Sequence, residues 1–203
     1  MATKSATIVQ KLNRPGEGAL VDVVRMGGPN SHVMQYSADL SMVPVPDRRY
    51  PSDVAAIVDD EYMVRLLFGQ RKIAGMGLRS LLVIHMTFDS IKQFLTALEP
   101  LEKKHLELLK KLPGGKLFEI GEEPQQTVAL AATAAIAGFT GTESCLDFYH
   151  SSPFSIQKAQ LGGKLALEPV VRVTVPTSVF FAMWQRLKEL EPRLPTMSVE
   201  VTS

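Results

Sequence analysis

Two stretches of the chain share one design, in which an apolar segment of strand length runs directly into an amphipathic helix pattern. The first stretch is residues 81–112, and the second, shorter one is residues 170–190. In both, apolar residues crowd the first six positions and then recur at helical spacing. Each element must bury its apolar face against another. The sequence therefore predicts an α+β fold, an antiparallel sheet with two pseudo-repeated strand–strand–helix units and with the helices packed on the sheet.

The two stretches align with an offset of 89 residues (170 − 81), which places Leu81 on Val170 and Leu98 on Leu187. The apolar positions match in pattern, whereas identity is limited to the final leucine. A strand followed by a helix is also a common arrangement, so true duplication and coincidence are both open at this point.

Candidate strands precede each stretch, at residues 54–58 and 62–68 in the first unit and at 145–149 in the second. Residues 127–139 (TVALAATAAIAGF) allow a helix by alanine content or a strand by position, and we favour a strand because glycines follow. Further strands are expected near the N-terminus and in the alternating tail. The predicted organisation is an N-terminal arm with strands (1–51), a first unit (52–113), a connector (114–126), a second unit (127–195) and a tail (196–203).

Both helix patterns carry more apolar surface than one sheet needs. Pro100 either kinks the first helix or begins a second one, and the leucine–lysine stripe beyond it has no counterpart in the second unit. The last helix is apolar nearly all round, which requires cover on both faces or contact with another chain. The candidate interface residues are Leu101, Leu108, Leu109, Phe180, Trp184 and Leu187.

The loop of residues 69–80 is rich in glycine and basic residues, which raises the question of phosphate binding. A phosphate loop places its glycines between a strand and the start of a helix, whereas a strand is expected to follow here. A hairpin loop is therefore the favoured interpretation. The second hairpin loop also carries lysines, so the two loops predict a surface for an acidic partner, formed by Arg71, Lys72, Lys158 and Lys164.

No catalytic, cofactor-binding or metal-binding residue is predicted. Cys145, Asp147 and His150 are close in sequence, but on a strand the third lies on the opposite face from the first two. The four histidines lack metal-ligand spacing, and His85 in an apolar strand is expected to be a core histidine. A single cysteine allows neither an internal disulfide nor a cysteine-based zinc site.

Charge and hydropathy exclude other classes. A net charge of +1 gives no basic surface of the kind that nucleic-acid binding requires, so a nucleic-acid partner is not expected. No apolar window is long enough to span a membrane, and the N-terminus lacks a signal-peptide core. We expect a cytoplasmic protein whose partner is a protein, either a second copy or another chain.

The first unit resembles a family of short bacterial proteins catalogued only as a domain of unknown function. The matching segments are residues 64–70 (VRLLFGQ), 83–87 (VIHMT) and 91–98 (IKQFLTAL). They correspond to a strand with a Phe-Gly-Gln ending, a valine-rich strand and a helix. The second unit departs from this pattern, with Phe148-Tyr149-His150 in place of the Phe-Gly-Gln sequence. The family brings no known catalytic residues, so the resemblance implies a small noncatalytic bacterial or phage protein.

These observations favour a noncatalytic protein–protein interaction or oligomerisation module over an enzyme. A more specific alternative is chaperone-like binding of apolar client segments, in a groove along Phe180, Trp184 and Leu187. An alternative of another class is a small-molecule-binding protein or enzyme whose site is assembled from distant segments. That alternative predicts one pocket with perturbed ionisable groups, including His85 or His150.

Overall fold

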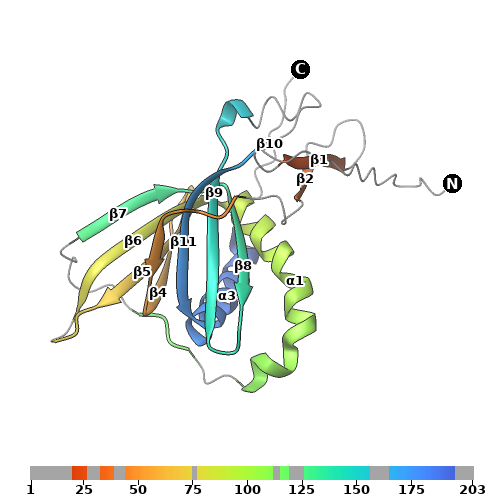
Figure 1. Ribbon diagram of the computed structural model, residues 1–203. Helices are drawn as coiled ribbons and strands as arrows, with labels where there is room; N and C mark the ends of the chain where they lie inside the picture. Colours follow the sequence, from red (N-terminus) through yellow and green to blue (C-terminus); the bar gives the residue numbers. More distant parts are fainter. Residues whose placement is uncertain are drawn as a thin grey trace. The chain divides into compact units, whose positions relative to one another are not determined.

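The computed structural model describes residues 20–26, 33–38, 44–74, 77–111, 115–118, 126–155 and 165–194, and for residues 20–26, 33–38, 100–111 and 165 only the backbone course. Its residues form two compact units, Met1–Val45 with Ser151–Glu168, and Pro46–His150 with Pro169–Ser203. The predicted α+β class is confirmed, and most strand pairings are antiparallel (Figure 1). No helix within the described ranges has both the length and the apolar character needed to cross a bilayer.

The first compact unit contains a three-stranded sheet with the order β10-β1-β2. Strand β1 lies in the centre and pairs antiparallel with both neighbours. Strands β1 and β2 agree with the strands expected near the N-terminus. The strands are β1 (Leu20–Met26), β2 (Val33–Ala38) and β10 (Leu165–Ala166).

The second compact unit contains two four-stranded sheets. The first large sheet has the order β4-β5-β6-β7, and the second large sheet has the order β3-β11-β9-β8. In the first, the strands are β4 (Val54–Asp59), β5 (Met63–Arg71), β6 (Leu78–Thr87) and β7 (Gln126–Ala131). In the second, they are β3 (Arg49–Pro51), β8 (Ala134–Phe139), β9 (Glu143–His150) and β11 (Glu168–Pro176).

The prediction of one antiparallel sheet was wrong in two respects, because there are two large sheets and both are mixed. Strand β7 pairs parallel with β6, and the three-residue strand β3 pairs parallel with β11. Each parallel partner comes from a distant part of the sequence. Residue periodicity reports which face of a strand is buried, not which strand lies beside it, so these pairings left no local signal.

Residues 127–139 are strands, as favoured from the sequence, but they form two strands in different sheets. At the boundary, the N–H of Ala132 donates to His85 O at 2.9 Å, within the first large sheet. The next N–H, of Thr133, donates to Tyr149 O at 2.8 Å in the second. The chain therefore crosses from one sheet to the other between two adjacent residues.

Two long helices follow the central strands, and each begins where its strand ends. Helix α1 is Phe88–Lys111, and Pro100 lies within it as part of one helix. The hydroxyl of Thr87 accepts the N–H of Ser90 at 3.3 Å and caps its start. Helix α3 is Thr177–Leu190, and the short helix η2 (Glu191–Arg193) ends it.

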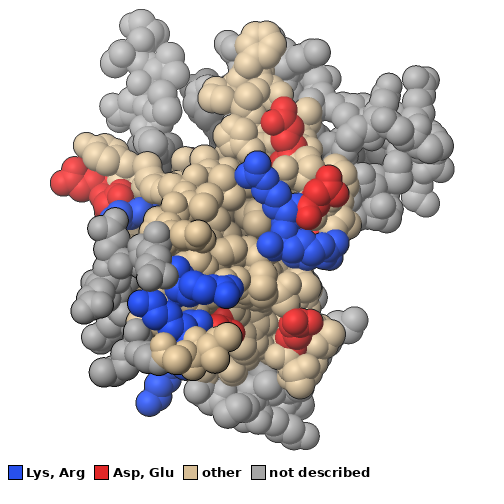
Figure 2. Space-filling model, turned by 60° about the vertical axis from the view of Figure 1, so that its left-hand side comes forward, with Lys and Arg blue, Asp and Glu red and all other residues tan. Residues whose placement is uncertain are grey.

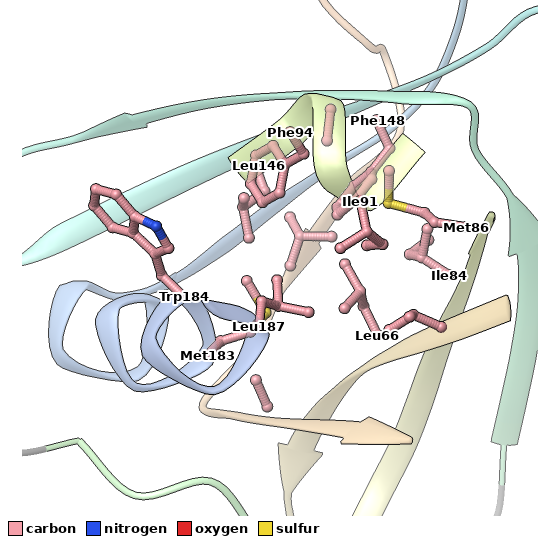
Figure 3. Close-up of a cluster of buried hydrophobic side chains, with 14 of the residues drawn as sticks. Leu66, Ile84, Met86, Ile91, Phe94, Leu146, Phe148, Met183, Trp184 and Leu187 are labelled. Atoms are coloured by element: carbon pink, nitrogen blue, oxygen red, sulfur yellow. The ribbon is translucent and has the colours of Figure 1, made fainter. Parts of the chain in front are cut away.

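One core cluster joins both large sheets and both helices (Figure 3). It includes Leu66 and Ile84 from the first large sheet, Leu146 and Phe148 from the second, and side chains from α1 and α3. On α3 all the large apolar side chains are buried. The apolar character of this helix is therefore explained by burial within the chain.

This burial corrects one part of the predicted interface. Phe180, Trp184 and Leu187 are 0%, 3% and 0% exposed, and the first two rings contact each other with centroids 5.9 Å apart. They are buried and therefore not available to a partner as an exposed apolar groove. The predicted interface residues Leu101, Leu108 and Leu109 lie outside the residues whose side chains are described.

Candidate functional site

The free edges of the two large sheets differ in how they are protected. Unpaired backbone groups on a sheet edge are a ready template for another strand, and proteins normally cover or blunt them. Strand β8 contacts α1, and strand β4 contacts α3. The N–H of Phe118 also donates to Ala55 O on β4, at 3.0 Å. The remaining two edges, β3 and β7, are the parallel strands.

The β3 edge is blunted by its side chains. The carbonyl of Arg48 accepts the N–H of Arg172, and the N–H of Ser52 donates to Thr174 O, both at 2.8 Å. Because backbone direction alternates along a strand, the groups of Arg49 and Pro51 must face away from β11. Arginine is a charged edge residue and proline offers no N–H, so this edge is a poor template.

The β7 edge has no strand partner among the described residues. The hydrogen bond from Ala132 to His85 fixes which backbone groups face β6, so those of Thr127, Ala129 and Ala131 face outward. These three residues are exposed, and in the described part of the chain β7 has no second neighbouring strand (Figure 1). Val128 between them is 50% exposed.

The composition of β7 also favours pairing. Its sequence, QTVALA, contains no charged residue and no proline, which are the usual means of protecting an edge strand. An extended chain can add to such an edge by main-chain hydrogen bonds, while its alternate side chains contact the face of the sheet. The β7 edge is therefore the candidate functional site, and its chemistry is that of strand addition.

The predicted acidic-partner surface is only partly described. Arg71 and Lys72 are exposed at the end of β5, and the N–H of Arg71 donates to the carboxylate of Asp53. Lys158 and Lys164 lie outside the described residues, so their position relative to Arg71 stays a prediction. On the face in Figure 2, Lys and Arg side chains gather mainly in two groups with acidic residues among them, rather than in one basic patch.

The outer face of the second large sheet carries a partly buried ion pair. The Arg172 guanidinium donates to both carboxylate oxygens of Asp147, at 2.5 Å each, from neighbouring strands. The hydrogen bond with Asp147 raises the pKa of Arg172. Cys145 lies on the same face, and its Sγ is 3.9 Å from the hydroxyl of Thr174. His150 lies on the opposite face by strand alternation, so no cysteine–histidine pair forms.

Tyr149, beside this ion pair, gives the fold a testable dependence on pH. Burial raises the pKa of its phenol to about 12, and the Asp147 carboxylate adds to the rise. The side chain is only 2% exposed. An unfolded tyrosine ionises near pH 10, so the unfolded chain loses this proton first.

The free energy of unfolding is therefore expected to fall as the pH rises from about 10 to about 12, by about 2–3 kcal/mol from this group. Below pH 10 the protonated Tyr149 phenol makes its full contribution to the free energy of unfolding. Urea titrations across this range should show the decline in the wild-type chain and a smaller one in Tyr149→Phe, which keeps the ring but cannot ionise. Identical declines in the two proteins would assign the effect to other groups.

The histidines and a hollow on the described surface do not form a common site. Nδ1 of His85 lies 3.1 Å from Sδ of Met63, and His150 is half-buried on another strand. A hollow of about 370 Å³ is lined by Asp47, Arg48, Pro169 and Val170, beside the pairing of β3 with β11. Within the described residues no cluster of histidine, cysteine and carboxylate side chains is suited to a metal.

Sequence reasoning missed the β7 edge, although it placed a strand there. The absence of charge and proline in residues 126–131 was a readable signal, but its meaning depends on the strand being at an edge. Comparison of the chain with protein-family models, with curated proteins and with solved structures gave no match. The resemblance of the first unit to a family of unknown function stays a prediction.

Proposed function

We propose that the chain is a noncatalytic protein–protein interaction module, built from two copies of one strand–strand–helix unit, whose β7 edge binds an extended strand. The observation that carries the binding role is the open, uncharged β7 edge beside a blunted β3 edge. Under the proposed duplication, β3 and β7 are equivalent strands of the two copies, so their edges can be compared residue by residue.

The hairpins support the duplication. Strands β4 and β5 match β8 and β9 with an offset of 80 residues, and the turns between them are built alike. A carboxylate oxygen of Asp60 accepts the N–H groups of Tyr62 and Met63, each at 3.0 Å. The hydroxyl of Thr140, 80 residues on, accepts the N–H groups of Thr142 and Glu143.

The parallel pairings support it further, because they are reciprocal. Arg49 of β3 pairs with Arg172, and Ala129 of β7 pairs with Val83. These pairs are related by the same two offsets, since 129 − 49 = 80 and 172 − 83 = 89. The strand before each hairpin thus pairs in the sheet that contains the other hairpin. The helices follow the same rule, because α1 contacts β8 and α3 contacts β4.

This correspondence shows where the two copies differ. Arg49 and Pro51 on the β3 edge stand where β7 has Ala129 and Ala131. One copy therefore carries both protective residues, and the other carries neither. We attribute the difference to function. The fold protects the β3 edge but leaves the equivalent β7 edge unprotected, and an unprotected edge is a site for another strand.

Copying the protected edge onto the open one tests this role. The double variant Ala129→Arg/Ala131→Pro reproduces the β3 edge on β7, and Pro51 shows that proline is accommodated at this position. Selection from a displayed library of short peptides against the wild-type protein should yield extended, β-branched sequences. The double variant should bind the selected peptides at least about tenfold more weakly, because it loses an outward N–H and gains a charge.

The matched control is Ile73→Arg, since Ile73 is fully exposed in the loop after β5 and lies outside the edge. It should bind the peptides like the wild type. Equal binding by the double variant and the control would contradict a role for β7, and circular dichroism would verify that both variants remain folded.

A further inference from the structure

We infer that the strand added at the β7 edge is β7 of a second copy of this chain, in antiparallel pairing about a two-fold axis at Ala129. The inference rests on the proposed function, because it names the occupant of the same edge. The inference follows from the self-complementarity of β7, whose backbone groups and side chains can pair with those of β7 in a second chain.

The backbone matches itself in this register. A two-fold axis perpendicular to the sheet keeps each face of β7 on the same side in both copies. Residues whose N–H and C=O groups point away from β6 therefore lie opposite the same kind of residue in the second copy. With the axis at Ala129, Thr127 lies opposite the partner's Ala131, and Ala129 opposite the partner's Ala129. Both are hydrogen-bonded pairs, which exchange two N–H···O bonds each. The pairing therefore satisfies every outward N–H and C=O of Thr127, Ala129 and Ala131.

The side chains match as well. In the same register Val128 lies opposite the partner's Leu130, on the face of the sheet that belongs to the core. Val128 is 50% exposed in the single chain, and Leu130 is only partly buried. The contact would cover both apolar side chains, and no charged group on either strand opposes it.

The same operation fails at the β3 edge, which explains why one edge is used and not both. A two-fold axis there would bring Arg49 toward the partner's Arg49, and Pro51 has no N–H to donate. The chain is thus protected against self-pairing at β3 and unprotected at the equivalent β7. A strand without charges also offers nothing to select a charged foreign partner, whereas it is complementary to itself.

A cysteine placed on the axis tests the register directly. Cys145 is the only cysteine of the chain, so Ala129→Cys in a Cys145→Ser background carries one thiol. In a hydrogen-bonded antiparallel pair the two Cα atoms are about 5.5 Å apart, which suits a disulfide. Mild oxidation at micromolar protein should give a disulfide-linked dimer at least about tenfold faster than for Ile73→Cys in the same background, as close pairing requires. Equal rates would overturn the inference, because they report random collision.

Light scattering and the peptide assay separate the possible failures. A dimer that becomes monomeric in Ala129→Arg/Ala131→Pro supports the inference, and one that persists in this variant overturns it. A wild-type monomer whose β7 edge still binds the selected peptides overturns the second copy as occupant, while the proposed function stands. A monomer that binds no peptide contradicts both.

Discussion

Replacing Phe148 with alanine is expected to lower the free energy of unfolding by about 3–5 kcal/mol. The Phe148 side chain is fully buried on β9 of the second large sheet. Its ring lies 5.9 Å from that of Phe68 on β5 of the first large sheet. The substitution removes a large apolar group at the contact between the two sheets, and well-packed surroundings close such a cavity only in part. Urea denaturation would measure the loss.

The control for this prediction is Tyr62→Ala, since Tyr62 is an aromatic residue of the same compact unit but is 71% exposed. Its replacement should change the free energy of unfolding by no more than about 0.5 kcal/mol. A double-mutant cycle with Phe68→Ala should give a coupling of about 0.5–1.5 kcal/mol between the rings. Independent effects of the two substitutions would mean that the sheets do not share a core at this point.

Breaking the ion pair on the second large sheet is also expected to lower the free energy of unfolding. Arg172→Ala leaves the Asp147 carboxylate without its partner, and Asp147 is only 8% exposed. Loss of one member of a buried pair costs about 3–5 kcal/mol. Because the side chain of Arg172 is 23% exposed, solvent screening lowers the expected loss below this range, to about 2–3 kcal/mol.

The proposed duplication supplies the compensating variant. Leu67 and Val83 of the first large sheet correspond to Asp147 and Arg172, and these two apolar residues pack together. The double variant Asp147→Leu/Arg172→Val should therefore recover stability to within about 1 kcal/mol of the wild type, because a buried ion pair is often replaceable by packed apolar residues. Urea titrations of the single and double variants decide this. A double variant less stable than Arg172→Ala would contradict the correspondence.

The failure of the predicted interface on α3 has a simple physical reason. An all-round apolar helix is compatible with burial on every side or with an exposed contact face, and sequence alone does not distinguish them. Phe180 and Trp184 are buried because α3 packs in a core shared by both large sheets. Which of the two outcomes applies depends on the elements that surround the helix, and these come from both copies of the proposed repeat.

The sequence by itself determined the local elements of this protein. Alternation and helical spacing located the hairpins, the central strands and the two long helices, because side-chain burial has the period of the element. It left a repeat open as one of two interpretations, with a single offset of 89 residues. In the structure the offset between matching elements changes from 80 to 89 residues across the longer loop between β9 and β11.

Only the tertiary structure decided that β3 pairs with β11 and β7 with β6, and which sheet edge is open. Parallel pairing joins segments that are distant in sequence, and the direction of a backbone N–H follows from the strand that it faces. The residues QTVALA form an ordinary strand, and they become an open edge only because β6 pairs on one side of them while no strand of the described chain pairs on the other. The same alternation of backbone groups makes Pro51 harmless on β3, because its missing N–H would have faced outward.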